Sequence, residues 1–453
     1  MPLSAAGNDG TRSLKPSTGD DARRDPPRIV YRGIGHAALR SNGRSRRSPR
    51  RLVPLRSGCR SDAKREQNRY VTRDLARIVT RNAHSRGSCW PTPQQTLLLR
   101  AVLLTGAPAL EAFQAWRGRV NLDRLDRGSF RLLPLLAHNL RRHEVRDPIM
   151  ARLEEVCRDT RSKNVALMER LATLLAAFSE AGLETMILKG AALLVLYYSD
   201  PGLRPMSDLD LLVRTDKASG AMALLRQLGW TPQLPVPERV VPVTHSHLFQ
   251  DRRDTRLDLH WHLCWECCGP GADDAFWAAA QAVAVDGVPT SALCRADQLL
   301  HATVHGVAWN PVPPLRWVAD AMLILQAAGP SFEWSRLLTQ ARHLKLILPL
   351  REALAFMRDT LDAPVPDVVL ATLRASQVSR FERFEYRARI RPWGWYGALP
   401  RLVCHYLRLS GSAGQPQGLQ GLRGFPRYLQ HLYGLARLRD LPSALWARLL
   451  RNA

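Results

Sequence analysis

The sequence of 453 residues contains little lysine, which makes its large positive charge a weak guide to function. Lysine occurs at six positions against 59 arginines, a skew that indicates a coding bias toward arginine. Residues 1–90 hold 21 Lys and Arg against 7 Asp and Glu, so 14 of the 25 excess positive charges lie in this first fifth. Clustered cations attract nucleic acids and anionic surfaces. Nucleic acid is therefore an open partner class that the charge distribution does not favour.

The chain also lacks a cysteine framework and a long apolar run. Eight cysteines without regular spacing do not resemble the disulfide pattern of a small secreted domain, so a reducing compartment is expected. No stretch reaches the roughly 18 apolar residues of a membrane helix, and the N-terminus has no compact apolar core of a signal peptide. We expect a soluble, cytoplasmic protein without a membrane partner.

The first part of the chain divides by composition and apolar period. Residues 1–90 are rich in Arg, Ser, Gly and Pro, which predicts disorder, whether as a basic tail or as an over-extended start of the reading frame. Helical periods follow near PTPQQTLLLRAVLL, where Thr92 suits a helix cap, then at 130–143 and 148–180. We expect a disordered segment (1–90), a helical segment (91–183), a core of mixed strands and helices (184–290), a helical segment packed on that core (291–375) and a helical C-terminal extension (376–453).

Within the expected core the pattern changes to short strands and helices. Strands are predicted at 184–189 and 207–214, with a helix opened by Gly190 between them. A second helix with Asp216 as candidate cap follows, and from about residue 273 the pattern is mostly helical. Two further strands are predicted at 243–250 and 255–263. The fold class is therefore α+β, a small mixed sheet flanked by largely helical segments.

The strand patterns place acidic side chains together. Asp208 and Asp210 project from one face of their strand because side chains alternate, and Asp258 and His260 share a face of the strand 255–263. If the two strands pair with polar faces matched, three carboxylates converge. Hard divalent cations prefer such oxygen ligands, and two ions about 4 Å apart suit phosphoryl chemistry. The alternative is that the D-L-D strand is only a solvated edge.

Longer strings of this sequence resemble a known family. LKGAALLVLYYSDPGLRPMSDLDLLV (188–213) and LDLHWHL (257–263) are similar to uncharacterised bacterial nucleotidyltransferases of the polymerase-β-like superfamily. FRLLPLLAHNL, HATVHG and LRWVADAMLIL also resemble flanking segments of that family, so the resemblance covers roughly residues 93–360. It implies a polymerase-β-like nucleotidyltransferase core. It also implies catalytic, metal-binding roles for the paired Asp208 and Asp210 and for Asp258 as third carboxylate.

Nucleotide-binding residues are expected around this core. Gly190 fits a strand-to-helix turn whose free N–H groups receive phosphate, and Lys189 is placed to contact the β- or γ-phosphate. Arg204 can bind phosphate oxygens through its two-pronged guanidinium, while Ser207 either reaches the phosphates or only turns the chain. His260 belongs to the resemblance and is expected beside the metal site. No Ser follows the glycine, and seventeen residues separate Gly190 from the D-L-D strand, both departures from the superfamily pattern.

Two weaker signals favour structural roles. Cys264 and Cys267 form half of a zinc pattern, but no second C-x-x-C follows, so a zinc site is not favoured. His301 and His305 lie one helical turn apart and can ligate a metal as a pair, although a packed helix face is the expectation.

These observations predict a transferase that moves a nucleoside monophosphate from an NTP, with ATP the leading choice, to an unidentified hydroxyl or phosphate of a small molecule, peptide or protein. The expected cofactor is Mg²⁺, with Mn²⁺ as the alternative. Two other readings stay open: a non-catalytic nucleic-acid-binding or regulatory protein with a degenerate core, and kinase-like transfer of the γ-phosphoryl group.

Overall fold

The computed structural model describes residues 88–452, apart from 234–237, 270, 393–394 and 413–418. The predicted disorder of residues 1–90 therefore falls almost wholly outside the described residues. Across the described ranges, no helix combines the length and the apolar character that a bilayer crossing requires.

Helices form the part of the chain before the sheet. Thr92 caps the first of them as expected: its side chain accepts from the Gln95 N–H, and the Gln95 side chain accepts from the Thr92 N–H. The helices are α2 (Pro93–Leu103), α3 (Ala107–Arg117), α4 (Arg127–Phe130), α5 (Leu133–Arg142) and the long α6 (Ile149–Glu180).

Seven strands form one mixed sheet in the order β3-β4-β5-β2-β1-β7-β6. At its centre β2 pairs with β5 in parallel, and Asp210 lies opposite Asp258 in the register. The expected pairing of the two acidic strands with matched polar faces is therefore confirmed. The strands are β1 (Met186–Ile187), β2 (Leu209–Leu212), β3 (Thr231–Pro232), β4 (Ser246–Gln250), β5 (Arg256–His260), β6 (Gln281–Val285) and β7 (Val288–Ala292).

The hairpin of β6 and β7 corrects the expectation of mostly helix after residue 273. Its turn is Asp286-Gly287, and both residues have positive φ angles of 47° and 83°. Asp-Gly between two short runs favours this two-residue turn, because its twist matches that of the strands. β7 also pairs in parallel with β1, so the hairpin extends the sheet on that side.

The helices between the strands largely follow the sequence pattern. Helix α7 (Lys189–Tyr197) begins beside Gly190 as expected, directly after β1. Helix α8 (Ala218–Gln227) is present as well, but Asp216 does not cap it: a short 3₁₀ turn, Thr215–Lys217, precedes the helix and Asp216 is exposed. Helix α9 (Asp274–Ala278) lies between β5 and β6.

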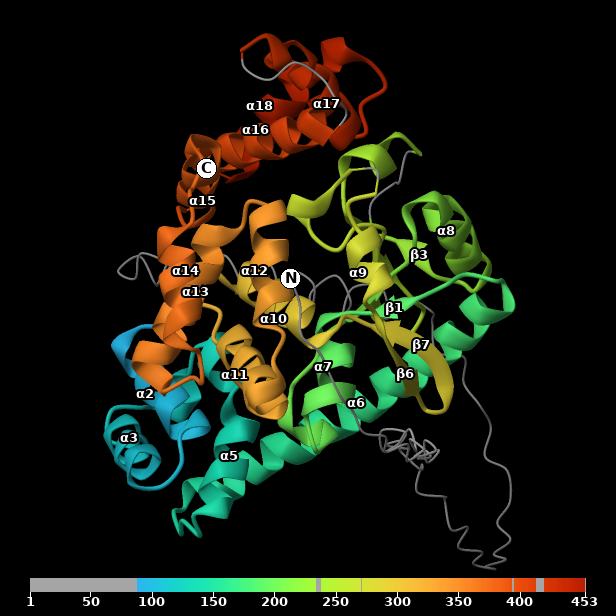
Figure 1. Ribbon diagram of the computed structural model, residues 1–453. Helices are drawn as coiled ribbons and strands as arrows, with labels where there is room; N and C mark the ends of the chain where they lie inside the picture. The colour runs from blue at the N-terminus through green and yellow to red at the C-terminus, as the bar shows by residue number, and fades with distance from the viewer. Residues whose placement is uncertain (1–87, 234–237, 270, 393–394, 413–418, 453) are drawn as a thin grey trace, which may run out of the picture. The chain divides into compact units, whose positions relative to one another are not determined.

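The two faces of the sheet are covered differently. Leu209, Leu211, Leu257 and Leu259 are fully buried in an apolar cluster that includes residues of α6 and α8. On the other face, Leu212 belongs to a larger cluster. This cluster consists mainly of residues from the helices that precede and follow the sheet in the sequence. Figure 1 shows the long α6 running past β6 and β7, which it contacts. The polar faces of β2 and β5 are thereby held at the boundary with the helical segments.

Helices dominate after the sheet, as expected. Gly306 at the end of α10 lies against the Trp317 ring of α11 so closely that no Cβ fits between them. The helices are α10 (Arg295–Gly306), α11 (Arg316–Ala328), α12 (Trp334–His343), α13 (Ile347–Leu361), α14 (Asp367–Ala375), α15 (Arg380–Arg389), α16 (Trp395–Ser412), α17 (Phe425–Leu432) and α18 (Leu441–Asn452).

Candidate active site

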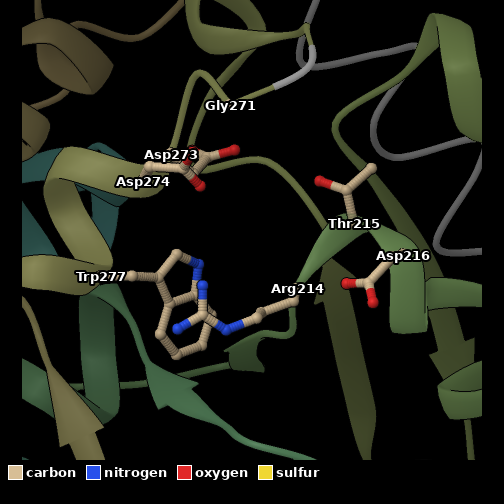
Figure 2. A pocket seen from close by; sticks show the side chains of 7 residues that line it. All are labelled: Arg214, Thr215, Asp216, Gly271, Asp273, Asp274 and Trp277. Carbon is tan, nitrogen blue, oxygen red and sulfur yellow. The ribbon is translucent and has the colours of Figure 1, made fainter.

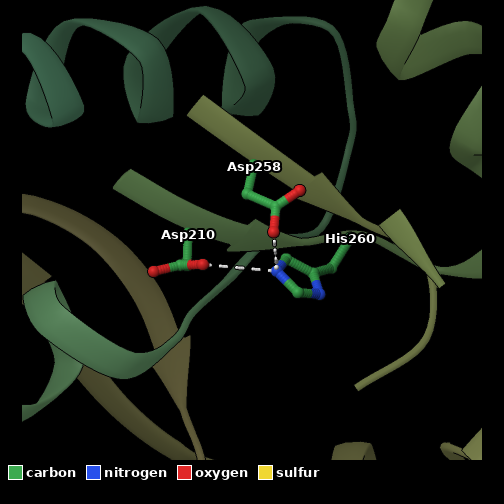
Figure 3. A group of neighbouring side chains, drawn as sticks. All are labelled: Asp210, Asp258 and His260. Carbon is green, nitrogen blue, oxygen red and sulfur yellow. Dashed lines mark hydrogen bonds and ion pairs between the residues drawn. The ribbon is translucent and has the colours of Figure 1, made fainter. Parts of the chain in front are cut away.

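Two carboxylates from neighbouring strands meet at one imidazole. Asp210 and Asp258 are register partners across β2 and β5. His260 Nε2 lies 3.3 Å from Asp210 Oδ1 and 3.0 Å from Asp258 Oδ2, and Figure 3 shows both carboxylates directed at it. Ligand atoms of these three residues all lie within 4.8 Å of one another. We call Asp210, Asp258, His260 and the adjoining Lys189 the carboxylate cluster.

Lys189 enters the cluster through an unusual backbone conformation. It is the first residue of α7 and has φ +41°, a left-handed value that costs a residue with a side chain roughly 1 kcal/mol or more. The preceding Leu188 N–H donates to the Asp210 carbonyl at 3.0 Å, which fixes the turn to β2. Lys189 Nζ then lies 2.6 Å from Asp210 Oδ1 and 3.8 Å from Asp258 Oδ2. The strained turn thus places an ammonium between the carboxylates.

The charges in the cluster support one another. Burial by itself lowers the pKa of Lys189, but Asp210 and Asp258 outweigh it and the pKa is raised. Burial likewise opposes ionisation of both aspartates, yet the cations Lys189 and His260 hold their pKa values well below the usual range. Together these shifts describe two ionised carboxylates at neutral pH.

His260 is oriented by its second nitrogen. Burial lowers its pKa, but Asp258 and Asp210 outweigh burial and raise it. Its Nδ1 lies 3.4 Å from the His262 carbonyl, and an N–H there leaves Nε2 directed at the carboxylates. Metal-bound histidines commonly donate their other N–H to a backbone carbonyl in this way. The donor set of two carboxylates and one imidazole therefore fits a divalent cation.

Asp208 and Ser207 stand at the edge of this arrangement. Asp208 precedes β2 and is half-buried, and Ser207 Oγ donates to its Oδ1 at 3.1 Å. The ligand group in the described part of the chain consists of Asp210, Asp258 and His260, without Asp208. Its carboxylate still lies close enough to Lys189 to raise the pKa of that side chain. The sequence predicted a ligand group of three carboxylates. In the structure Asp210 and Asp258 form this group with His260, and Asp208 lies beside it.

Arg204 differs from its expected arrangement. The residue is 3% exposed, and its Nε and Nη2 donate to the two carboxylate oxygens of Asp320 in α11, each at 2.8 Å. Tyr198 OH donates to the same carboxylate at 2.7 Å. The bidentate contact expected with a phosphate is therefore made with a carboxylate instead. Among the described residues Arg204 Nη1 has no hydrogen-bond partner, and a Cβ on Gly190 would lie 3.0 Å from it, so this nitrogen faces the first turn of α7.

Sequence reasoning missed or misjudged several neighbours of the cluster. The His245 ring packs edge-to-face against His260, with ring centres 5.4 Å apart. Burial and, to a smaller extent, the charge of His260 lower the pKa of His245. Its position directly before β4, whose polar side chains include His247, was the available signal. His301 is buried as expected of a packed helix face, whereas His305 is exposed.

The cysteines near β5 do not form a metal centre within the described residues. Cys264 Sγ and Cys267 Sγ lie 2.9 Å apart as free thiols, and no further ligand completes a group of three.

A separate pocket of about 210 Å³ lies beyond the far end of β2. Figure 2 shows Arg214 over the Trp277 ring, 4.8 Å from its centre, with Asp216 and Asp274 around the opening. Arg214 lies four positions beyond Asp210, about 13 Å in extended chain. The pocket is therefore distinct from the carboxylate cluster.

The strand pair, its carboxylates and the adjoining helix start define a nucleotidyltransferase core. Residues 129–362 match the model of a family described as uncharacterised nucleotidyltransferase. The match spans more than half of the chain, so the chain belongs to this family of transferases of phosphorus-containing groups. The expected fold class, α+β with a mixed sheet flanked by largely helical segments, is confirmed.

Solved structures of nucleotidyltransferases are similar at low identity. ANT(2″)-Ia in complex with adenylyl-2″-tobramycin is 15% identical, with a TM-score of 0.29 over 40% of this chain and 97% of that one. A nucleotidyltransferase-like protein from Paracoccidioides brasiliensis is 14% identical, with a TM-score of 0.30 over 47% and 94%. No curated protein matches the sequence. TM-scores of this size do not establish a common overall fold, so the family membership carries the assignment.

Proposed function

We propose that the protein transfers a nucleoside monophosphate from an NTP, ATP in the first instance, to an acceptor hydroxyl or phosphate. The observation that carries the proposal is the register of Asp210 opposite Asp258 on parallel strands, beside the start of α7. Ionised carboxylates at that position suit the binding of a metal-bound triphosphate, because the cation bridges negative groups that otherwise repel one another.

The proposed cation is Mg²⁺, held by Asp210, Asp258 and His260, with Asp208 beside them. When bound, such an ion neutralises charge on the phosphates and activates an attacking oxygen. Oxygen ligands suit Mg²⁺, whereas the imidazole nitrogen suits later transition metals, so Mn²⁺ is the alternative that this donor set supports.

The remaining roles follow from position. Lys189 and the N–H groups around Gly190 bind phosphate oxygens, because the start of a helix carries unpaired donors and a positive dipole end. We assign Asp258, the more exposed of the two carboxylates at 23% against 6%, to accepting the proton of the acceptor hydroxyl. Arg204 serves by supporting the first turn of α7, and Ser207 by bonding Asp208.

The test uses the full-length protein with NTPs labelled at the α- or the γ-phosphate, Mg²⁺ or Mn²⁺, and a cell lysate as acceptor source. We expect the α label to appear on an acceptor and chelation of the metal to stop transfer. Transfer of the γ label would establish the kinase-like alternative. No transfer with any NTP and either metal, together with no metal-dependent NTP binding, would establish the non-catalytic alternative.

A further inference from the structure

Two arginines that lie far apart in the sequence both interact electrostatically with Asp208, and neither forms an ion pair with a carboxylate among the described residues. Arg131 follows the short helix α4, and Arg316 is the first residue of α11. The two helix ends are close, since a Cβ added to Gly128 in α4 would lie 2.7 Å from the Pro313 carbonyl just before α11. We call Arg131 and Arg316 the arginine pair.

The hydrogen bonding of the pair is incomplete. Arg316 Nη1 donates to the Pro205 carbonyl at 2.6 Å, three residues before Asp208. Within the described ranges, the Arg131 guanidinium makes no hydrogen bond or ion pair. Both side chains are half-buried. A guanidinium has five N–H donors, and half-buried donors without protein partners are suited to a ligand.

The charges around the pair are mostly positive. Burial, together with the positive charge of nearby Arg204, lowers the pKa of Arg316 to about 10. Burial and then Arg127 lower the pKa of Arg131, while Asp208 acts on both residues in the opposite direction. Two carboxylates, Asp208 and Asp320, thus act against four guanidinium groups, and both oxygens of Asp320 already accept from Arg204. An anion with several charges would relieve this imbalance.

The same region continues into the helix start. Arg204 Nη1, buried and without a partner, faces the first turn of α7 at Gly190. Arg204 also acts electrostatically on both members of the arginine pair, so its unpaired nitrogen connects the pair to the start of α7. Guanidinium groups bind phosphate oxygens bidentately, and a row of them matches a chain of phosphates.

We propose that Arg131 and Arg316 bind the β- and γ-phosphates of the nucleotide and stabilise the pyrophosphate that leaves. This inference rests on the proposed function, since it names the residues that hold the leaving group at the same site. It assigns part of the nucleotide site to the helical segments outside the sheet.

The experiment measures binding of inorganic tripolyphosphate, ATP and AMP by calorimetry in the full chain, alongside transfer of the α label. We expect Arg131→Gln and Arg316→Gln each to weaken binding of tripolyphosphate and ATP about tenfold to a hundredfold. AMP binding should stay within about twofold, because AMP lacks the phosphates in question. Arg316→Lys keeps the positive charge on a single donor nitrogen, so it should retain part of the affinity for tripolyphosphate. It tests the same contact if the Gln variant folds poorly.

The matched control is Arg142→Gln, which removes the same charge from an exposed position at the far end of α5, about 14 Å along that helix. Its binding should equal that of the wild type. Wild-type affinity for tripolyphosphate in both pair variants, with α-label transfer intact, would overturn the inference and leave the proposed function standing. Weakened tripolyphosphate binding without any transfer by the wild type would support the anion site and refute the transferase. If the wild type does not bind tripolyphosphate, the proposal that the arginine pair binds phosphates is overturned.

Discussion

Two groups of buried charges among the described residues differ in how completely they are paired. In the carboxylate cluster, Lys189 is shared between two aspartates and His260 contacts both, so each anion keeps an oxygen that other cations can use. In the second group, Arg204 and Tyr198 occupy both carboxylate oxygens of Asp320, and all of these side chains are buried.

The difference separates a binding site from a structural clamp. A buried ion pair with satisfied hydrogen bonds holds helices together, whereas partly exposed carboxylates with shared cations can exchange those cations for a ligand. Asp258 and Lys189 are each 23% exposed, against 3% for Arg204 and 6% for Asp320. Asp210 is as buried as Asp320, but it shares its two cations with Asp258. We therefore expect substitutions in the first group to change activity most, and substitutions in the second to change stability most.

The largest effect is expected from Asp210→Asn. The amide keeps the size of the side chain but loses the negative charge, so α-label transfer should fall at least about a thousandfold. The free energy of unfolding should change by less than about 2 kcal/mol, because Asp258 still pairs with Lys189 and His260. Initial transfer rates and urea unfolding measure the two quantities. Asp216→Asn, an exposed carboxylate in the separate pocket, is the control and should keep full activity; equal activity in the Asp210 variant would contradict the assigned role.

The next effect is expected from Asp320→Asn, which leaves the Arg204 charge buried and poorly compensated. Loss of one partner of a buried pair costs roughly 3–5 kcal/mol, to be seen as a lower urea midpoint. Replacing both residues, as Arg204→Met with Asp320→Leu, should cost less than the single change, because no unpaired charge remains. If the single variant is as stable as the wild type, the group is not a structural clamp.

The smallest effect is expected for the difference in stability between two substitutions of Lys189 that both remove its ammonium. Lys189→Gly suits the left-handed backbone of φ +41°, whereas Lys189→Ala keeps the strain, so the glycine variant should be more stable by about 1 kcal/mol. Thermal or urea unfolding compares the two directly. Equal stability would show that the turn relaxes and that strain has no part in placing the side chain.

The predictable part of the site was local or periodic. Alternating Asp and Leu in two short strands sufficed to predict both strands and the polar face that they share. The family resemblance pointed to the same residues. Asp286-Gly287 carried a comparable local signal for the β6 and β7 hairpin, but the helical pattern around it led to a different interpretation.

The missed part depends on contacts between distant residues. Asp320 lies 116 residues beyond Arg204, and no spacing in the sequence indicates that these two pair. For the same reason Arg204 resembled a phosphate ligand when considered alone. Whether a charged side chain is free for a ligand is decided by its partners, which periodicity does not reveal.

The close approach of Gly128 to the Pro313 carbonyl has a practical meaning for anyone who dissects the protein. Any side chain at position 128 would push the ends of α4 and α11 apart, and a fragment limited to the strands would lack both helices altogether. Expression of an excised sheet should therefore yield neither a soluble mimic nor a portable enzyme, and engineering efforts should keep α4 and α11 together with the sheet.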